Sequence, residues 1–251
     1  MLRGVALAAL LLAATAGSEL APSGKLRVGV VAAPKPSAFF VVEQAGKPHG
    51  VTVDLGQSFA KTLGVPVEFL VAHNSGEVTD ALEQGRIDVA FLPVDDERRK
   101  RVAFGPAYVQ FESTCLVLGS APFRAVRDLD RHGVRVGGEA NTTTFRAASA
   151  MLKSATVVPI RSVGEALAML KAGEIDAFAL GRTTLAAYQA EIQGSRILEG
   201  SFHTTGIAIA VAKDRPAALA RASAFIEEAK ASGAIRRALD RAGLQSIAVA
   251  P

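Results

Sequence analysis

A cluster of seven charged residues, Asp95 to Arg101, separates two apolar segments that both have the composition of strands. The acidic residues come first, and acidic groups are favourable at the positive N-terminal end of a helix. The spacing therefore predicts a short helix that begins at these acids. Runs of this kind are usually solvated helix faces, and we interpret Arg99, Lys100 and Arg101 in that way.

A second polar cluster, Asn141 to Thr144, lies where a predicted strand meets a predicted helix in the sequence ANTTTFRAASA. Hydroxyl groups and free backbone N–H groups at a helix N-terminus can bind an anion. The same residues also make an ordinary N-cap that needs no ligand. From these residues alone both interpretations stay open.

The spacing of other reactive residue types does not match common catalytic or metal sites. No G-x-S-x-G nucleophile motif occurs, and the four histidines lack metal-ligand spacing, so no metal or other cofactor is expected. The single cysteine, Cys115, lies in an apolar segment that is typical of a buried strand, which indicates a structural role. The histidines are His49, His73, His132 and His203.

Strand and helix patterns alternate from Lys25 onward. A helix is predicted where Leu55, Phe59 and Leu63 recur at helical spacing, and Gly64 supplies its C-cap. Strands that alternate with helices indicate an α/β fold with a largely parallel sheet. The predicted strands are KLRVGVVA, VPVEFLV, RIDVAFL, GVRVGG, TVVPI and GIAIAVAKD, with helical patterns between them and at the C-terminal end.

Two segments repeat one another. ALEQGRIDVAF and MLKAGEIDAFA match in order, so that Gly85 corresponds to Gly173 and Asp88 to Asp176. A repeat of this kind predicts two lobes of similar construction. Each glycine is expected to end a helix in a left-handed conformation, and the two aspartates are expected to be turn or cap residues rather than catalytic groups.

The N-terminal segment MLRGVALAALLLAATAGS has the architecture of a cleavable export signal, with cleavage expected after Ala16. No later apolar run approaches the length of a membrane span. The formal net charge of +4 is mild, and no basic stripe interleaved with aromatic residues occurs, which argues against a nucleic-acid partner. The 49% apolar content is ample for a core.

Taken in order, these pieces resemble the family 3 extracellular solute-binding proteins, the polar-amino-acid-type receptors of bacterial ABC importers. The matching positions cover nearly the whole chain after the signal segment. They are Gly50, Val53, Asp54 and Leu55; Ala81, Leu82, Gly85 and Asp88; Asp96, Glu97, Arg98, Val102, Phe104 and Tyr108; Asn141 to Thr144; Gly173, Ile175, Asp176 and Ala177; and Gly206, Ile207, Ala208 and Lys213.

The resemblance implies a two-lobed, type II periplasmic-binding-protein-like fold, in which two α/β lobes are joined by two crossing hinge segments and close around a ligand. It also implies a periplasmic location and a monomer. The implied division is residues 1–16 as signal peptide, 25–108 plus 206–251 as lobe 1, 113–200 as lobe 2, and 109–112 and 201–205 as hinges.

The resemblance also implies a ligand site. Arg98 is expected to grip a ligand carboxylate in two parallel hydrogen bonds, which a lysine cannot copy. Arg98→Ala is accordingly expected to abolish binding and leave the fold intact. Thr142, Thr143 and Asn141 are expected to contact the ligand from the other lobe. Phe39 is expected to pack on it, with Phe40 pointing the opposite way along a strand.

The chain departs from the family pattern at the positions that hold an amino acid. Gly181 stands where amino-acid binders place an aspartate for the ligand's ammonium, and Pro93 replaces a threonine that precedes the arginine. These changes favour a carboxylate that needs no partner for an α-ammonium. The alternative is a substitute acid, for which Glu139 is best placed. Arg182 is expected either to add a second positive contact or to point outward.

The function that the resemblance implies is a non-enzymatic receptor that captures a small carboxylate-bearing solute, an amino acid or related organic acid, and delivers it to a membrane-embedded ABC permease. The alternative is a periplasmic enzyme on the same fold, a cyclohexadienyl-dehydratase-like lyase. That activity requires an acid or base in the cleft. The candidates are Glu139, Glu112, Asp95 and His73.

Overall fold

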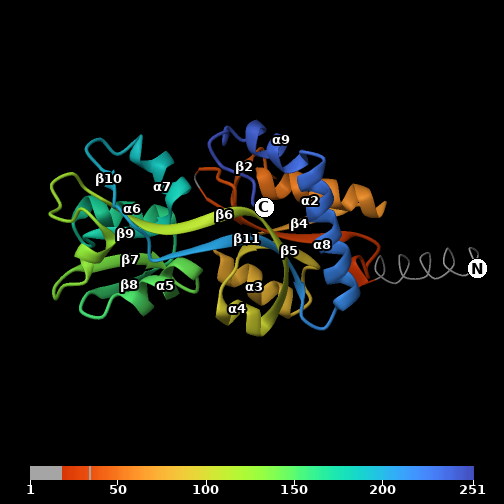
Figure 1. The fold of residues 1–251 in the computed structure, drawn as a ribbon, viewed down its shortest axis with the longest axis horizontal. Helices are drawn as coiled ribbons and strands as arrows, with labels where there is room; N and C mark the ends of the chain where they lie inside the picture. The colour runs from red at the N-terminus through yellow and green to blue at the C-terminus, as the bar shows by residue number, and fades with distance from the viewer. Residues whose placement is uncertain (1–18, 34) are drawn as a thin grey trace, which may run out of the picture.

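The computed structural model describes residues 19–33 and 35–251 as two lobes, joined by long strands. Figure 1 shows the lobes side by side, with the N-terminal strands and the C-terminal helices together in one of them. The predicted signal peptide, residues 1–16, lies outside the described residues. None of the described helices is both long and apolar enough to cross a membrane.

The first lobe is built from the two ends of the chain. Strand β1 pairs in parallel with β2, β4 and β5, which gives the parallel core that the alternating pattern predicts. The elements are β1 (Leu26–Ala32), β2 (Phe40–Gln44), β3 (Lys47–His49), α2 (Val51–Leu63), β4 (Val67–Ala72), α3 (Ser75–Glu83), β5 (Val89–Pro93), α4 (Asp96–Arg101), α8 (Pro216–Ala231) and α9 (Ala234–Arg241).

The second lobe is continuous in sequence. Strand β7 lies between β8 and β9 and pairs with both in parallel, as β1 does with its neighbours in the first lobe. The elements are the 3₁₀ helix η1 (Val126–Leu129), β7 (Arg135–Glu139), α5 (Thr143–Met151), β8 (Thr156–Ile160), α6 (Val163–Ala172), β9 (Ala177–Gly181), α7 (Arg182–Gln189) and β10 (Arg196–Ile197).

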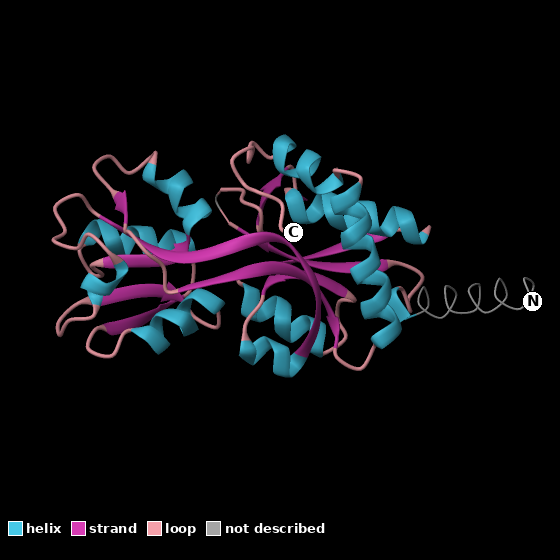
Figure 2. Cartoon of the chain, viewed as in Figure 1, coloured by secondary structure: helices cyan, strands magenta, loops and turns pink. Residues whose placement is uncertain are grey.

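Two antiparallel strands, β6 (Val102–Val117) and β11 (His203–Ala212), connect the lobes. Strand β11 pairs with β5 in the first lobe, and β6 pairs with β9 in the second. Figure 2 shows the two strands running side by side from one lobe to the other. The predicted hinge 109–112 lies within β6, and 201–205 spans the start of β11. The exact hinge boundaries stay predictions.

Left-handed glycines end the helices where the sequence predicts. Gly64 caps α2 with φ of 68°, and Gly173 caps α6 with φ of 69°. Gly85 has the same conformation, φ of 68°, just after α3. A residue with a Cβ is strained at such angles, so each glycine fixes the point where the chain turns into the next strand.

The repeated aspartates are structural, as expected, and each lies in the bend directly before a strand. Asp88 accepts hydrogen bonds from the backbone N–H of Arg27 (2.9 Å) and from its guanidinium (2.6 Å). Asp176 accepts the corresponding backbone bond from Arg135 at 2.8 Å and lies 3.2 Å from its Nη2. Each aspartate therefore ties the start of a strand to the first strand of its lobe.

The two aspartates differ in burial, so the same substitution at each is expected to cost a different amount of stability. The Asp88 side chain is 0% exposed and that of Asp176 is 33% exposed. Asp88→Asn leaves a guanidinium beside an amide in a buried setting, so it is expected to lower the free energy of unfolding by about 1–3 kcal/mol. Asp176→Asn is expected to cost less, because water reaches that pair. Denaturant melts of both variants check the ranking, and equal costs would contradict it.

The cysteine is part of the core. Cys115 lies in β6 and is fully buried, and this burial raises the pKa of its thiol well above the usual range. A protonated, buried thiol is a poor nucleophile. This environment agrees with the structural role predicted for Cys115.

Candidate functional site

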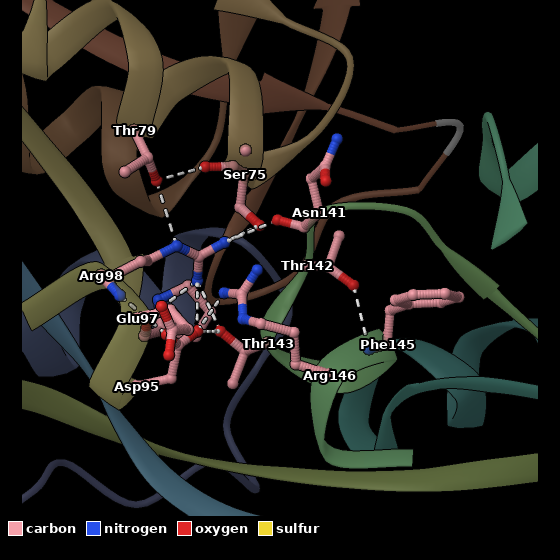
Figure 3. A network of polar contacts seen from close by, with 12 residues as sticks. Ser75, Thr79, Asp95, Glu97, Arg98, Asn141, Thr142, Thr143, Phe145 and Arg146 are labelled. Carbon is pink, nitrogen blue, oxygen red and sulfur yellow. Dashed lines mark hydrogen bonds and ion pairs between the residues drawn. The ribbon is translucent and has the colours of Figure 1, made fainter. Parts of the chain in front are cut away.

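Arg98 lies at the place where the two lobes meet, and its side chain is only 2% exposed. Three of its hydrogen bonds stay within the first lobe. Nε donates to the Thr79 hydroxyl (3.0 Å), Nη1 to the Pro93 carbonyl oxygen (2.9 Å), and Nη2 to the Ser75 hydroxyl (2.5 Å). These contacts fix the plane of the guanidinium, as Figure 3 shows for Thr79 and Ser75.

The two terminal nitrogens of Arg98 also reach the second lobe. Nη1 donates to the Thr143 hydroxyl (2.5 Å), and Nη2 lies 3.4 Å from the carbonyl oxygen of Asn141. Asn141 has φ of 62°, a left-handed angle that asparagine tolerates better than most residues. The predicted residues Arg98, Asn141 and Thr143 are thus brought together across the lobes (Figure 3).

Asp95 completes this network. Its Oδ1 caps α4 by accepting from the Arg98 backbone N–H (2.9 Å), and its Oδ2 accepts from the Thr143 hydroxyl (2.6 Å) and from Arg146. Burial by itself raises the pKa of Asp95, but the hydrogen bond from Thr143 and the other donors outweigh it and hold that pKa below its usual range. Asp95 is therefore an anion paired on both sides of the lobe boundary.

Burial has the opposite effect on the cation. It lowers the pKa of Arg98 to about 9, and the carboxylate of Asp95 offsets part of that shift. The guanidinium stays charged at neutral pH and is surrounded by oxygen acceptors. A carboxylate that replaced Thr143 and Asn141 at the two terminal nitrogens would gain two charge-assisted hydrogen bonds.

Two helices begin beside Arg98. Ser75 is the first residue of α3, which Asn74 caps by accepting from the backbone N–H of Gly76 (2.9 Å). Thr143 is the first residue of α5, which Thr142 caps by accepting from the backbone N–H of Phe145 (3.2 Å). Helix N-termini carry partial positive charge, so both lobes contribute a potential that favours an anion here.

Thr142 therefore has a capping role, and its hydroxyl also donates to the Glu139 carbonyl oxygen (2.7 Å). The cap interpretation of ANTTTF is confirmed, and the ligand interpretation stays a prediction. Thr142 also lines a small cavity between the lobes. The cavity measures about 20 Å³, which is about the space of one water molecule. Its lining residues are Phe39, Phe40, Ser75, Pro93, Phe111, Glu139, Thr142, Thr143, Thr144 and Leu180.

Phe39 lines the cavity, and its contact with a ligand stays a prediction. The expectation that Phe40 points away is wrong, because Phe40 lines the same cavity. Strand β2 begins only at Phe40, and Phe39 belongs to a turn in which the Ser37 hydroxyl accepts from the backbone N–H groups of both phenylalanines (3.1 and 2.9 Å). The alternation of a strand does not apply to a turn. The two rings lie together, with centroids 4.9 Å apart.

An aromatic ring fills the space beside Gly181, where the family resemblance implies an aspartate. A Cβ on Gly181 would lie 2.6 Å from Cε2 of Phe111, a separation that side chains do not adopt. Arg182 does not enter the cavity. It pairs with Glu112 (2.9 Å) and donates to the Gly200 carbonyl oxygen (2.8 Å), which ties β6 to the segment before β11.

The four residues considered for acid or base catalysis do not converge. Glu112 is paired with Arg182, Asp95 with the network around Arg98, and His73 is exposed. Of the four, Glu139 alone lines the cavity. Burial raises the pKa of Glu139 to about 7.

Several site residues were not identified from the sequence. Ser75 and Thr79 hold the guanidinium. Thr144, which belongs to the predicted polar cluster, lines the cavity, and its hydroxyl shares an unpredicted hydrogen bond with Ser113 of β6 (2.9 Å). The pattern Asn74-Ser75 after a strand is an N-cap signal that could have indicated Ser75. The contact of Phe111 with Gly181 has no local signal, because it depends on how β6 and β9 pair.

The rest of the charged cluster is at the surface, as interpreted from the sequence. Lys100 pairs with Glu97 (2.6 Å), and Arg101 pairs with Asp80 (2.7 Å) and Glu83. Paired surface charges of this kind contribute little to stability. Among residues 19–33 and 35–251, no group of three or more histidine, cysteine or acidic side chains is arranged to hold a metal ion.

The family model of bacterial extracellular solute-binding proteins, family 3, matches residues 26–244. The chain belongs to this family. Solved structures place the solute-binding protein among type II periplasmic binding proteins, which confirms the predicted family and the two-lobed α/β fold class. A mutant of ArgBP from T. maritima is 27% identical, with a TM-score of 0.79 and coverage of 90% of this chain and 98% of that one.

Two further proteins that resemble this chain have descriptions that mention an enzyme. The ancestral amino acid-binding protein AncCDT-1, described as a precursor of cyclohexadienyl dehydratase, is 26% identical with a TM-score of 0.78, covering 90% of this chain and 98% of that one. Membrane-bound lytic murein transglycosylase F of Maricaulis maris is 34% identical over 128 residues, 49% of this chain and 27% of that protein. The chain thus matches about a quarter of the length of that relative.

Proposed function

We propose that the protein is a periplasmic receptor that captures a small carboxylate-bearing solute, an amino acid or a related organic acid, and delivers it to an ABC permease. The observation that carries this proposal is Arg98, a buried guanidinium whose terminal nitrogens point across the lobe boundary at Thr143 and Asn141. Two helix N-termini begin at the same place. Such a combination of a fixed planar cation and helix dipoles suits a carboxylate.

Binding in this proposal requires the lobes to separate and close. A cavity of about 20 Å³ does not accept an amino acid, so the solute enters when the second lobe withdraws Thr143 and Asn141 from Arg98. The ligand carboxylate then takes their place at the guanidinium. Closure is stabilised by contacts on both sides, including the ion pair between Lys35 of the first lobe and Glu191 of the second.

A melting screen tests the receptor function. Common L-amino acids and small organic acids are added to the protein, and a true ligand at about a thousand times its dissociation constant is expected to add about 4 kcal/mol of stability. Small-angle scattering with each hit is expected to show a smaller radius of gyration at saturation. A screen in which no carboxylate raises the melting temperature would contradict the proposal.

We propose that the protein is not an enzyme. The alternative, a lyase of the cyclohexadienyl dehydratase kind, is favoured by one observation, the buried acid Glu139 in the cavity lining. The acids that could act with it are paired elsewhere. Overnight incubation of each hit with the protein, followed by mass spectrometry, separates the two functions, since a receptor returns the compound unchanged.

A further inference from the structure

Glu139 is a buried acid without a basic partner. It is the last residue of β7 and is 3% exposed. Within residues 19–33 and 35–251, no lysine, arginine or histidine forms an ion pair with it. The backbone N–H of Val163, at the start of α6, lowers the pKa of Glu139 by less than burial raises it. An ionised carboxylate in such a setting carries a desolvation cost that only a cation or further donors can offset.

The charged and titratable groups around Glu139 do not remove this cost. Glu77 of α3 is another acid, and its charge disfavours ionisation of Glu139. Tyr188 of α7 is close enough for the negative charge of Glu139 to affect its hydroxyl. Burial, together with that charge, raises the pKa of Tyr188 to about 12, so its hydroxyl stays neutral. Lys35 is paired with Glu191.

The two sides of the cavity therefore differ in the charge that lies next to them. On the first-lobe side Ser75 and Pro93 hold the Arg98 guanidinium, and on the second-lobe side Glu139 presents a carboxyl group. The remaining lining consists of phenylalanines, threonines and a leucine, which carry no charge. A ligand that satisfies both sides when the lobes close must carry a negative and a positive group.

We propose, on the basis of the proposed function, that Glu139 binds a cationic nitrogen group of the ligand and so selects solutes that carry a carboxylate and a cation together. It does this in place of the aspartate that Phe111 excludes from Gly181. The cation has two possible sources, an α-ammonium group or a side-chain ammonium or guanidinium group. Both sources present the same chemistry to the carboxylate.

Calorimetry with four probes separates these sources. L-arginine carries both cations, its 2-hydroxy analogue carries only the guanidinium, L-citrulline carries only the α-ammonium, and the 2-hydroxy analogue of citrulline carries neither. The same pairing of each common L-amino acid with its 2-hydroxy acid extends the panel. Cation-bearing probes are expected to bind the wild-type protein, and the best of them is expected to bind about 100-fold more weakly to Glu139→Gln.

The pH dependence gives a second readout. Binding a cation requires ionised Glu139, so the affinity is expected to rise about tenfold per pH unit below pH 7 and to level off above it, since burial raises the pKa of this carboxyl to about 7. Glu139→Gln is expected to abolish this dependence. Glu139→Asp keeps the charge on a shorter side chain, so it is expected to bind weakly and to retain the dependence.

A matched control is Glu165→Gln, on α6 of the same lobe, whose carboxylate pairs with Arg161 at the surface. It is expected to bind the probes as the wild type does. Unchanged affinity in Glu139→Gln would overturn the proposal. Wild-type binding of only those 2-hydroxy acids that carry no cationic group would also overturn it, and that result would leave the receptor function standing. If no probe binds at all, the receptor function fails and this role of Glu139 fails with it.

Discussion

Arg98→Ala is expected to reduce carboxylate binding by at least 1,000-fold and to lower the free energy of unfolding by about 3–5 kcal/mol. The loss of binding follows because the terminal nitrogens of Arg98, which reach Thr143 and Asn141 of the second lobe, are the donors proposed to hold the ligand carboxylate. The loss of stability follows because the Pro93 carbonyl oxygen and the hydroxyls of Ser75 and Thr79 lose a buried donor. Calorimetry and denaturant melts measure the two effects separately.

Two further variants make this result interpretable. Arg98→Lys keeps the charge but cannot supply the fork of donors, so it is expected to regain part of the stability and little of the binding. Arg99→Ala removes the neighbouring charge and is expected to leave both properties near wild type, because Arg99 takes no part in the network around Arg98. Wild-type affinity in Arg98→Ala would eliminate Arg98 as the carboxylate partner.

Gly181→Asp is expected to destabilise the protein by about 4 kcal/mol or more, although the family resemblance implies an aspartate at this position. A Cβ at this position overlaps the Phe111 ring, and Gly181→Ala alone is expected to cost about 1–3 kcal/mol for that reason. The aspartate adds the cost of a carboxylate in a fully buried strand. Thermal melts of both variants check the order.

The steric origin of this effect can be isolated. Phe111→Leu is expected to recover part of the stability of Gly181→Ala, so that the double variant is more stable than the sum of the single effects. Gly164→Ala is the control, since a Cβ there meets only the Ser162 hydroxyl oxygen at 3.9 Å and lies inside α6. It is expected to be neutral or slightly stabilising. An unchanged melt of Gly181→Ala would show that Phe111 yields without cost.

The order of helices and strands could be predicted because the residues that end or position each element lie within that element. The glycines at 64, 85 and 173 end helices through their own backbone angles, and the spacing of Leu55, Phe59 and Leu63 places one face of α2. The repeat around Asp88 and Asp176 indicated two similar lobes. The contacts of these aspartates were missed, because their partners Arg27 and Arg135 lie far away along the chain.

The residues that meet at Arg98 were predictable in part, but their contacts were not, and their role in ligand binding stays a prediction. Arg98 and Thr143 were identified separately through the family pattern, while their hydrogen bond depends on how the lobes meet. Phe40 was misplaced because a turn through Ser37 replaces the expected strand. From the sequence, Arg98→Ala was expected to leave the fold intact. The structure instead predicts a loss of stability, because Thr79 is a buried partner of Arg98 that the sequence did not reveal.

The paired crossing strands also set an order for folding during synthesis. Residues of the second lobe are contiguous, so β7, β8 and β9 can pair as soon as that segment has been synthesised and released. The first lobe has to wait, because Leu92 of β5 pairs with Ala208 of β11 across the whole intervening lobe. Closing so long a loop slows folding. The nascent first lobe therefore leaves one edge of β5 unpaired until β11 arrives, and an unpaired strand edge of this kind can pair with another chain.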